Sequence, residues 1–272
     1  MAQAKQFSGK TVLLSGASSG IGACFAEQLA EQGADLILTA RSAETLNQLA
    51  GRLRQQYAVK VSVFPADLAQ TGAAQALYER ILQAQLVVDI LINNAGFGKW
   101  TEFLQQDLRT YQQMLQLNIQ SLTELSYLCL PAMLARRSGG IINVASTGAF
   151  QPLPYIAVYG ASKAYVLSLT EAMATEYKNT GLQFQVLCPG NTHTNFARVA
   201  NANTSGMTGA SPEDVVRSSL RAWHKGEVCH IHGTGNFLTA LLPRILPRKM
   251  VTAIVAAMFK DKLQPAAPRV LN

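Results

Sequence analysis

The fold is decided by the stretch Thr11-Val12-Leu13-Leu14-Ser15-Gly16-Ala17-Ser18-Ser19-Gly20-Ile21-Gly22. Its apolar first third predicts a short strand, and the pattern that continues to Ala30 predicts a helix. A glycine-rich turn between strand and helix lets the backbone approach an anion, and the helix N-terminus supplies free N–H groups and a positive dipole end. The stretch therefore predicts a phosphate cradle, although the same spacing alone also fits a plain tight turn.

Strand and helix signals alternate along most of the chain. Besides the first strand, apolar runs predict strands at 36–40, 59–64, 89–92, 141–145, 182–188 and 228–231. Because helical patterns lie between them, we expect right-handed crossovers and a mostly parallel sheet of about seven strands. This predicts a single α/β domain over 1–272 with its ligands at the carboxyl ends of the strands.

Arg41 follows the second strand, which ends at Ala40. In a dinucleotide-binding sheet this position faces the adenosine ribose, where an acid binds the 2′-hydroxyl and an arginine accepts a 2′-phosphate. The strand offers Arg41 and no acid at position 40, which favours NADP(H). The alternative is a surface arginine at the start of the helix predicted over 42–56.

Polar residues also follow the later strands. Asn93-Asn94-Ala95-Gly96 ends the fourth strand, and Ser146 follows the fifth. Asn118 lies in the middle of a helical segment over 107–137, where asparagine is mildly unfavourable. Ser146 could be a simple loop residue and Asn118 an exposed polar position, so neither is decisive alone.

Tyr159-Gly160-Ala161-Ser162-Lys163 places a tyrosine and a lysine four residues apart in a segment that reads as helical. At that spacing both side chains lie on one helix face. A nearby ammonium favours phenolate, so we expect Lys163 to lower the pKa of Tyr159 and make it a usable acid and base. The alternative is a packed tyrosine beside a surface lysine.

Together with Pro189-Gly190, these motifs resemble the short-chain dehydrogenases/reductases over roughly residues 8–195. The resemblance implies a doubly wound Rossmann-type domain, a nicotinamide cofactor and a catalytic set of Asn118, Ser146, Tyr159 and Lys163. It also implies family-like homodimers or homotetramers through the two long helices. Two positions depart from the family pattern, since Ser15 replaces a threonine and Thr192 a valine.

The cofactor site implied by the resemblance extends beyond the glycine-rich turn. Asp67 and Leu68 would meet the adenine, residues 94–96 the adenosine, and Thr192 and Thr194 the nicotinamide carboxamide. The expected cofactor contacts are Gly16, Ser18, Ser19, Gly20, Ile21, Gly22, Arg41, Asp67, Leu68, Asn94, Ala95, Gly96, Tyr159, Lys163, Pro189, Gly190, Thr192 and Thr194.

The expected reaction is reversible hydride transfer between NADPH and a carbonyl carbon. Tyr159 would protonate the alkoxide, Ser146 would hold the carbonyl oxygen, Lys163 would also bond the nicotinamide ribose, and Asn118 would keep a water-linked proton path open. The expected substrate pocket comprises Phe97, Ser146, Phe150, Tyr155 and Phe196. Because it offers no fixed cation, we expect a hydrophobic ketone, aldehyde or 3-oxoacyl chain; the alternative is a catalytically silent NADP-binding sensor or interaction module.

Composition narrows the class of protein. With 49% apolar and 14% charged residues the chain suits a buried parallel sheet, not disorder. The net charge of +7 suits anionic partners, but the basic residues are scattered, so we expect no nucleic acid. The four dispersed cysteines indicate buried residues in a reducing compartment, and no metal-ligand spacing is present. Because no secretory signal is visible at the N-terminus, a cytoplasmic location is expected.

The segment 236–262 follows the substrate loop expected over 191–210 and lies outside the 8–190 cofactor-binding and catalytic core. It contains two apolar runs, 237–242 and 250–259, each too short to span a bilayer. Prolines at 243 and 247 prevent one continuous helix. Two readings stay open: a pair of helices over the substrate cleft or a subunit interface, or a surface docked on anionic lipid through its basic residues. These are Arg244, Arg248, Lys249 and Lys260.

Overall fold

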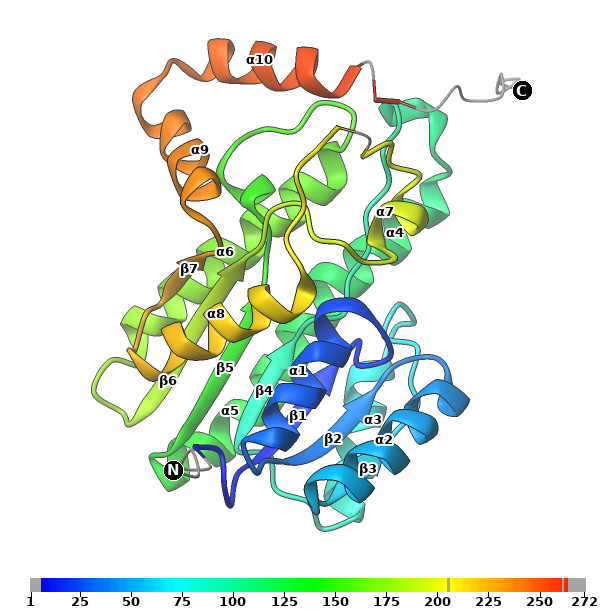
Figure 1. The fold of residues 1–272 in the computed structure, drawn as a ribbon, viewed down its shortest axis with the longest axis vertical. Helices are drawn as coiled ribbons and strands as arrows, with labels where there is room; N and C mark the ends of the chain where they lie inside the picture. The colour runs from blue at the N-terminus through cyan, green and yellow to red at the C-terminus, as the bar shows by residue number, and fades with distance from the viewer. Residues whose placement is uncertain (1–5, 205, 261, 264–272) are drawn as a thin grey trace.

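A computed structural model of the chain describes residues 6–204, 206–260 and 262–263. At its centre is a seven-stranded sheet in the order β3-β2-β1-β4-β5-β6-β7, and every neighbouring pair is parallel (Figure 1). The predicted sheet is therefore confirmed. The strands are β1 (Thr11–Ser15), β2 (Asp35–Thr39), β3 (Val61–Val63), β4 (Ile90–Asn93), β5 (Gly139–Val144), β6 (Leu182–Cys188) and β7 (Cys229–Ile231).

Helices cover both faces of the sheet, as in a doubly wound fold. One face packs against α1 (Gly20–Glu31), α2 (Ala43–Tyr57) and α8 (Pro212–His224). The other packs against α3 (Ala73–Gln83), α5 (Leu122–Arg136) and α6 (Ala157–Glu176). The remaining helices are α4 (Leu108–Leu115), α7 (Phe196–Ala200), α9 (Thr234–Ile245), α10 (Arg248–Lys260) and the short turns η1 (Phe103–Gln105), η2 (Gln116–Ser121) and η3 (Thr147–Phe150).

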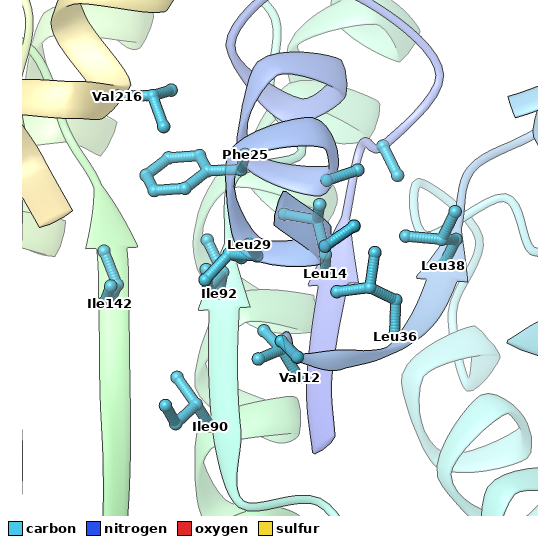
Figure 2. Packing of buried hydrophobic residues seen from close by; sticks show 14 of the residues in the cluster. Val12, Leu14, Phe25, Leu29, Leu36, Leu38, Ile90, Ile92, Ile142 and Val216 are labelled. Atoms are coloured by element: carbon cyan, nitrogen blue, oxygen red, sulfur yellow. The ribbon is translucent and has the colours of Figure 1, made fainter. Parts of the chain in front are cut away.

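The core on the α1 side shows why the first motif fixes the fold. Val12 and Leu14 alternate onto this face of β1, while Phe25 and Leu29 are spaced by one helical turn and point back at the sheet (Figure 2). Val216 of α8 packs into the same cluster, and all five side chains are fully buried. Truncating Phe25 to alanine would cost about 3–5 kcal/mol by the usual cavity penalty.

A buried polar network joins the central strands to the helices of the opposite face. The Asn93 amide donates to Asn143 Oδ1 at 2.9 Å and to Ser126 Oγ at 3.1 Å. Asn143 in turn donates to Thr170 Oγ1 at 2.9 Å. Because unpaired amides are costly in a core, this network fixes how β4 and β5 meet α5 and α6.

Four details differ from the sequence-based expectations. The helical segment over 107–137 is interrupted by the π-helical η2, and the loop over 191–210 contains α7. Pro243 lies inside the last turn of α9, where it removes only one helix hydrogen bond, so the two apolar runs separate at Pro247. Only two cysteines are fully buried; Cys24 and Cys229 are partly exposed. Cys24 donates to Glu213 Oε1 of α8 at 3.4 Å, which leaves it at the rim of the α1–α8 contact.

The C-terminal extension predicted over 236–262 forms the two helices α9 and α10, as expected. Residue 261 of this extension lies outside the described residues. α10 lies across one end of the molecule, above the loop that leads into α6 (Figure 1). In the part of the chain that the structure describes, no helix has both the length and the apolar character to cross a bilayer.

Candidate active site

The glycine-rich turn after β1 is locked to the end of β4. The Ser15 hydroxyl accepts hydrogen bonds from the Asn94 and Ala95 backbone N–H groups, both at 3.0 Å. The Asn94 side-chain amide donates to the carbonyls of Ser15 and Gly16, at 3.0 and 3.1 Å. Ser15 thus keeps the hydroxyl function of the threonine it replaces, and the Asn94 side chain is used to hold the turn.

Three glycines keep the surface of this turn open. Gly16 has φ +66° and Gly20 φ +54°, both in the left-handed region that favours glycine. A Cβ at Gly22 would collide with the Gly16 carbonyl. The Ser19 side chain does not cap α1, so the first N–H groups of this helix have no side-chain acceptor. This arrangement fits a cofactor pyrophosphate, as the sequence predicted.

The loop after β6 approaches the same turn from the opposite side. A Cβ at Gly20 would lie 2.9 Å from Thr194 Cγ2. Thr194 Oγ1 also accepts from the Phe196 N–H at 3.2 Å, while Thr192 Oγ1 donates to the Gly190 carbonyl at 3.1 Å. Thr194 therefore lies against the cradle, and Thr192 lies two residues before it on the same loop.

The residues expected at the adenosine end lie at the ends of β2 and β3. Arg41 is exposed immediately after β2, beside the start of α2. The Asp67 carboxylate accepts from the Ala69 N–H at 3.2 Å and from the Gln70 side-chain amide at 3.3 Å, so both of its oxygens are used within its own turn. The Leu68 side chain is buried and its carbonyl accepts from Ser121 Oγ at 2.7 Å, which leaves its side chain no access to an adenine.

Ser146, Tyr159 and Lys163 converge at the carboxyl end of β5. Ser146 follows the strand and caps η3, its hydroxyl accepting from the Gly148 N–H at 3.0 Å. The Ser146 hydroxyl lies close enough to the Tyr159 phenol to favour its ionised form. Lys163, one helical turn on, is 5% exposed, and its ammonium donates to the Val144 carbonyl at 2.8 Å. The ammonium lies 5.8 Å from the centre of the Tyr159 ring.

Asn118 is placed by the π-helical η2, a feature that is frequent at functional sites. Its amide is 1% exposed and clamps the loop after β4, donating to the Phe97 carbonyl at 3.0 Å and accepting from the Phe97 N–H at 3.2 Å. A third bond runs to Ser162 Oγ at 3.0 Å, which itself donates to the Tyr159 carbonyl at 2.7 Å.

Two residues that lie next to Asn118, Ser162 and Gly96, connect it to Tyr159 and Lys163. Sequence reasoning missed Ser162; its position three residues after Tyr159, on the same side of the helix, was the available signal. A Cβ at Gly96 would lie 3.1 Å from Asn118 Oδ1 and 3.3 Å from Lys163 Nζ, so both groups flank this glycine. The water-linked path between them stays a prediction.

Burial is the main cause of the pKa shifts of Tyr159 and Lys163. It raises the pKa of Tyr159 from 10 to about 12, and the nearby Ser146 hydroxyl acts in the opposite direction. Burial also lowers the pKa of Lys163 from 10.5 to about 8. The expectation that Lys163 lowers the pKa of Tyr159 is wrong for this structure, because the ammonium is bound to Val144 and the low-dielectric surroundings prevail. At neutral pH the phenol therefore holds its proton and can donate it.

The structure places the predicted pocket residues Phe97, Phe150, Tyr155 and Phe196 at different positions around the site. Phe196 packs on the Tyr159 ring with centroids 5.4 Å apart, and Phe97 borders the site through its clamped backbone. Tyr155 turns the chain into α6 with φ +67°, and its carbonyl accepts from the Thr101 N–H at 2.8 Å. Phe150 instead lines a separate cavity beside the start of α6.

A cavity of about 490 Å³ lies between the start of α6 and the helices α9 and α10. Leu153 lines this cavity and also belongs to the cluster against which Tyr159 packs. Arg248 lies in the wall, although the sequence had offered no fixed cation near the substrate. The lining residues are Ala149, Phe150, Gln151, Pro152, Leu153, Pro154, Ala157, Gly160, Ala161, Ala164, Pro243, Arg248 and Val251.

The inner face of α10 closes this region. Val251 and Val255 are buried against Leu153 and Ile156, and Tyr159 packs against the same cluster. The rings of Trp100 and Phe259 meet edge to face with centroids 4.9 Å apart. Sequence reasoning missed Trp100, which ties the loop after β4 to α10.

Comparison with known proteins decides the family. A family model described as short chain dehydrogenase matches residues 10–205. The chain belongs to the short-chain dehydrogenase/reductase family. It is 33% identical over 218 residues to a very-long-chain 3-oxoacyl-CoA reductase from Anas platyrhynchos, covering 78% of this chain and 68% of that protein.

Solved structures agree with this assignment. A short-chain dehydrogenase from Sphingobium yanoikuyae in complex with NADPH is 30% identical, with a TM-score of 0.79 over 95% of this chain and 98% of that chain. An alcohol dehydrogenase from Comamonas testosteroni that is specific for bulky-bulky ketones is 27% identical, with a TM-score of 0.74 over 96% of this chain and 97% of that chain.

Family membership confirms the expected reaction class. The chain is an oxidoreductase that acts on CH–OH and C=O groups, and the silent-module alternative is not favoured. The geometry suits the chemistry of such an enzyme: a protonated phenol and a hydroxyl lie together at the carboxyl end of the sheet, beside a buried ammonium. A nicotinamide, when bound, supplies the hydride, and the protein supplies orientation and the proton.

Proposed function

We propose that this enzyme is an NADPH-dependent reductase of carbonyl groups on hydrophobic substrates, with the reverse alcohol oxidation available. The observation that carries the proposal is the convergence of the Ser146 hydroxyl, the Tyr159 phenol and the buried Lys163 ammonium at the carboxyl edge of the sheet, next to the open glycine-rich cradle. Ser146 donates a hydrogen bond to the carbonyl oxygen and stabilises its growing negative charge. Tyr159 then donates its proton to the same oxygen.

The protonation states support the reductive direction. Because burial raises the pKa of Tyr159 to about 12, the phenol stays protonated at neutral pH and is ready to donate. Lys163 is the nearest cation and supplies a positive field for the alkoxide and, by the family resemblance, a hydrogen bond to the nicotinamide ribose. Asn118 positions Tyr159 and Lys163, because it holds Ser162 of the same helix and the loop at Phe97.

The phosphorylated cofactor is favoured by the end of β2. Arg41 is exposed there, with Ala40 before it, so nothing acidic at position 40 repels a 2′-phosphate. The Sphingobium yanoikuyae relative, which is bound to NADPH, supports this choice. Asp67, residues 94–96, Pro189 and Gly190 would complete the adenosine and nicotinamide contacts, mostly through their backbone.

The substrate class follows from the walls of the site. Phe196, Leu153 and the inner face of α10 surround the phenol with apolar surface. We infer a substrate with a bulky or long apolar part, such as a ketone, an aldehyde or a 3-oxoacyl chain. The relatives that act on very-long-chain 3-oxoacyl-CoA and on bulky ketones support this class. The cavity beside Leu153 offers room for an apolar tail, and Arg248 in its wall suits an anionic end group.

Replacement of Tyr159 by phenylalanine tests the proposal. Turnover with NADPH on a panel of acyl, steroid and aryl carbonyls should fall by about 100-fold or more, since a general acid contributes roughly 10²–10⁴-fold. NADPH binding, followed by the fluorescence of the cofactor, should be retained. Tyr165→Phe on the same helix, where the hydroxyl bonds only to Thr123 Oγ1 at 3.0 Å, is the matched control. Near wild-type turnover of Tyr159→Phe would reject the assignment.

We infer one domain with the core at 8–190, the substrate loop at 191–210 and the extension at 236–262. We further infer a homodimer or homotetramer through α5 and α6, where Tyr127 is 77% exposed, and a cytoplasmic location with peripheral membrane contact. Light scattering of wild type and Tyr127→Glu tests the assembly; an unchanged mass would exclude this face.

A further inference from the structure

The last two helices of the chain leave a row of large apolar side chains in solvent. These seven residues, 45–78% exposed, are Phe237, Leu238, Leu242, Ile245, Met250, Ile254 and Met258, which together form the α9–α10 outer face. Leu238, Leu242 and Ile245 follow one another at helical spacing on α9, as Met250, Ile254 and Met258 do on α10. Isolated exposed apolar residues are ordinary, but a continuous series marks an interaction surface.

α10 is apolar nearly all the way round. Its inner side chains Val251, Val255 and Phe259 pack over the active site, while Ile254 and Met258 project outward. A helix with this pattern is normally buried or in contact with lipid. Its 13 residues span about 20 Å, shorter than the roughly 30 Å of a bilayer core, so it is suited to lie along a membrane interface and not to cross it.

The charge of this segment selects the kind of partner. Residues 228–260 contain no aspartate or glutamate, whereas α9 and α10 carry the four cations Arg244, Arg248, Lys249 and Lys260. All four are exposed. A second copy of the chain placed symmetrically on this face would bring these cations against their own equivalents, which is repulsive. An anionic surface complements them.

We propose that the α9–α10 outer face docks the enzyme on an anionic lipid surface. The apolar side chains enter the headgroup region while Lys249, Lys260 and Arg244 bind the headgroups. The proposal rests on the proposed function in one respect: the inner face of α10 forms the wall beside Tyr159, so docking places the active site at the membrane and gives it access to carbonyl compounds dissolved in lipid.

Vesicle co-sedimentation tests the docking. Wild type should bind phosphatidylcholine vesicles that contain phosphatidylglycerol far better than pure phosphatidylcholine vesicles, and high salt should weaken the binding. Lys249→Glu with Lys260→Glu should lower the binding constant by about fivefold or more per residue, the equivalent of about 1 kcal/mol each. Ile254→Glu with Met258→Glu should abolish measurable binding. Leu82→Glu, an equally exposed leucine on α3 at the other end of the molecule, should bind as wild type does.

Activity measurements separate docking from catalysis. The Ile254→Glu, Met258→Glu variant should reduce a small water-soluble ketone at the wild-type rate but lose the rate on a long-chain ketone carried in anionic vesicles. Absence of wild-type binding, or equal binding to neutral and anionic vesicles, would overturn the proposal. So would a wild-type oligomer that dissociates in this variant, because the outer face would then be an interface between copies. Failure of the small-ketone reaction in wild type would reject the proposed function instead.

Discussion

Lys163 gives a prediction in which catalysis and stability oppose each other. The side chain is 5% exposed, and the hydrogen-bond acceptor of its ammonium is the uncharged Val144 carbonyl. Burial therefore lowers its pKa from 10.5 to about 8. Since one pKa unit corresponds to about 1.4 kcal/mol, holding the ammonium in the folded protein at neutral pH costs about 3 kcal/mol of folding free energy.

Lys163→Met should relieve this cost while removing activity. Methionine fills much the same space without a charge. Loss of the hydrogen bond to Val144 offsets about 1 kcal/mol, so the variant should unfold with a free energy about 1–3 kcal/mol higher than wild type at neutral pH. Turnover should fall strongly, because the positive field beside Tyr159 is lost.

The pH dependence distinguishes this cause from simple repacking. The folded-state pKa is depressed, so between pH 8 and 10.5 the unfolded chain binds more protons than the folded one. Because of Lys163, the free energy of unfolding of the wild type increases as the pH rises from 8 to 10.5. The Lys163→Met variant lacks this increase. The excess stability of Lys163→Met over the wild type should be at its full value below about pH 8 and absent above about pH 10.5. Any contribution of Tyr159 is common to both proteins.

Urea unfolding of both proteins, without cofactor, at several pH values across this window measures the difference directly. An advantage that shrinks as the pH rises supports the account. A variant that is less stable than wild type at neutral pH, or an advantage that does not change with pH, would refute the reasoning.

Three further predictions concern other parts of the enzyme. Arg41→Ala should lower kcat/KM with NADPH by about 10–150-fold, the equivalent of a charge-assisted contact of about 1.5–3 kcal/mol, and leave NADH nearly unchanged; equal losses with both would remove Arg41 from the phosphate site. Asn118→Leu should lower the free energy of unfolding by about 2–4 kcal/mol, because it removes three buried hydrogen bonds and leaves the Phe97 backbone unpaired; urea unfolding checks this, and an unchanged midpoint would contradict the clamp. Truncation after Gly235 should reduce kcat/KM on long-chain carbonyls more than NADPH affinity; unchanged kinetics on both long and small carbonyls would show that α9 and α10 are neither lid nor docking element.

Much of the fold could be read from local sequence. The strands are apolar runs ended by glycine or polar residues, and the parallel arrangement follows because helical patterns separate them. The proposed catalytic residues Ser146, Tyr159 and Lys163 could be singled out because Ser146 follows a strand and the other two lie one helical turn apart. Ser211 shows the same for a helix start, since its hydroxyl accepts from the Asp214 N–H at 3.1 Å as its position before α8 predicts.

What could not be predicted depends on contacts between distant segments. A helical pattern does not reveal that η2 is π-helical, so the direction of the Asn118 amide toward Phe97 was not visible. The raised pKa of Tyr159 and the lowered pKa of Lys163 come from burial by several elements at once. The same holds for Arg248, which reaches the cavity wall only because α10 folds back over the loop before α6.

The central claim is hydride transfer from a nicotinamide to a carbonyl carbon, with the proton supplied by the protein. The most direct test uses NADPH with deuterium at both positions of the nicotinamide carbon that donates hydride, and mass spectrometry of the product of a hydrophobic ketone. The account predicts an alcohol with one deuterium on the carbinol carbon, formed by wild type and hardly at all by Tyr159→Phe. Oxidation of the labelled cofactor without deuterium on that carbon, or equal labelling by the two proteins at equal rates, would contradict it.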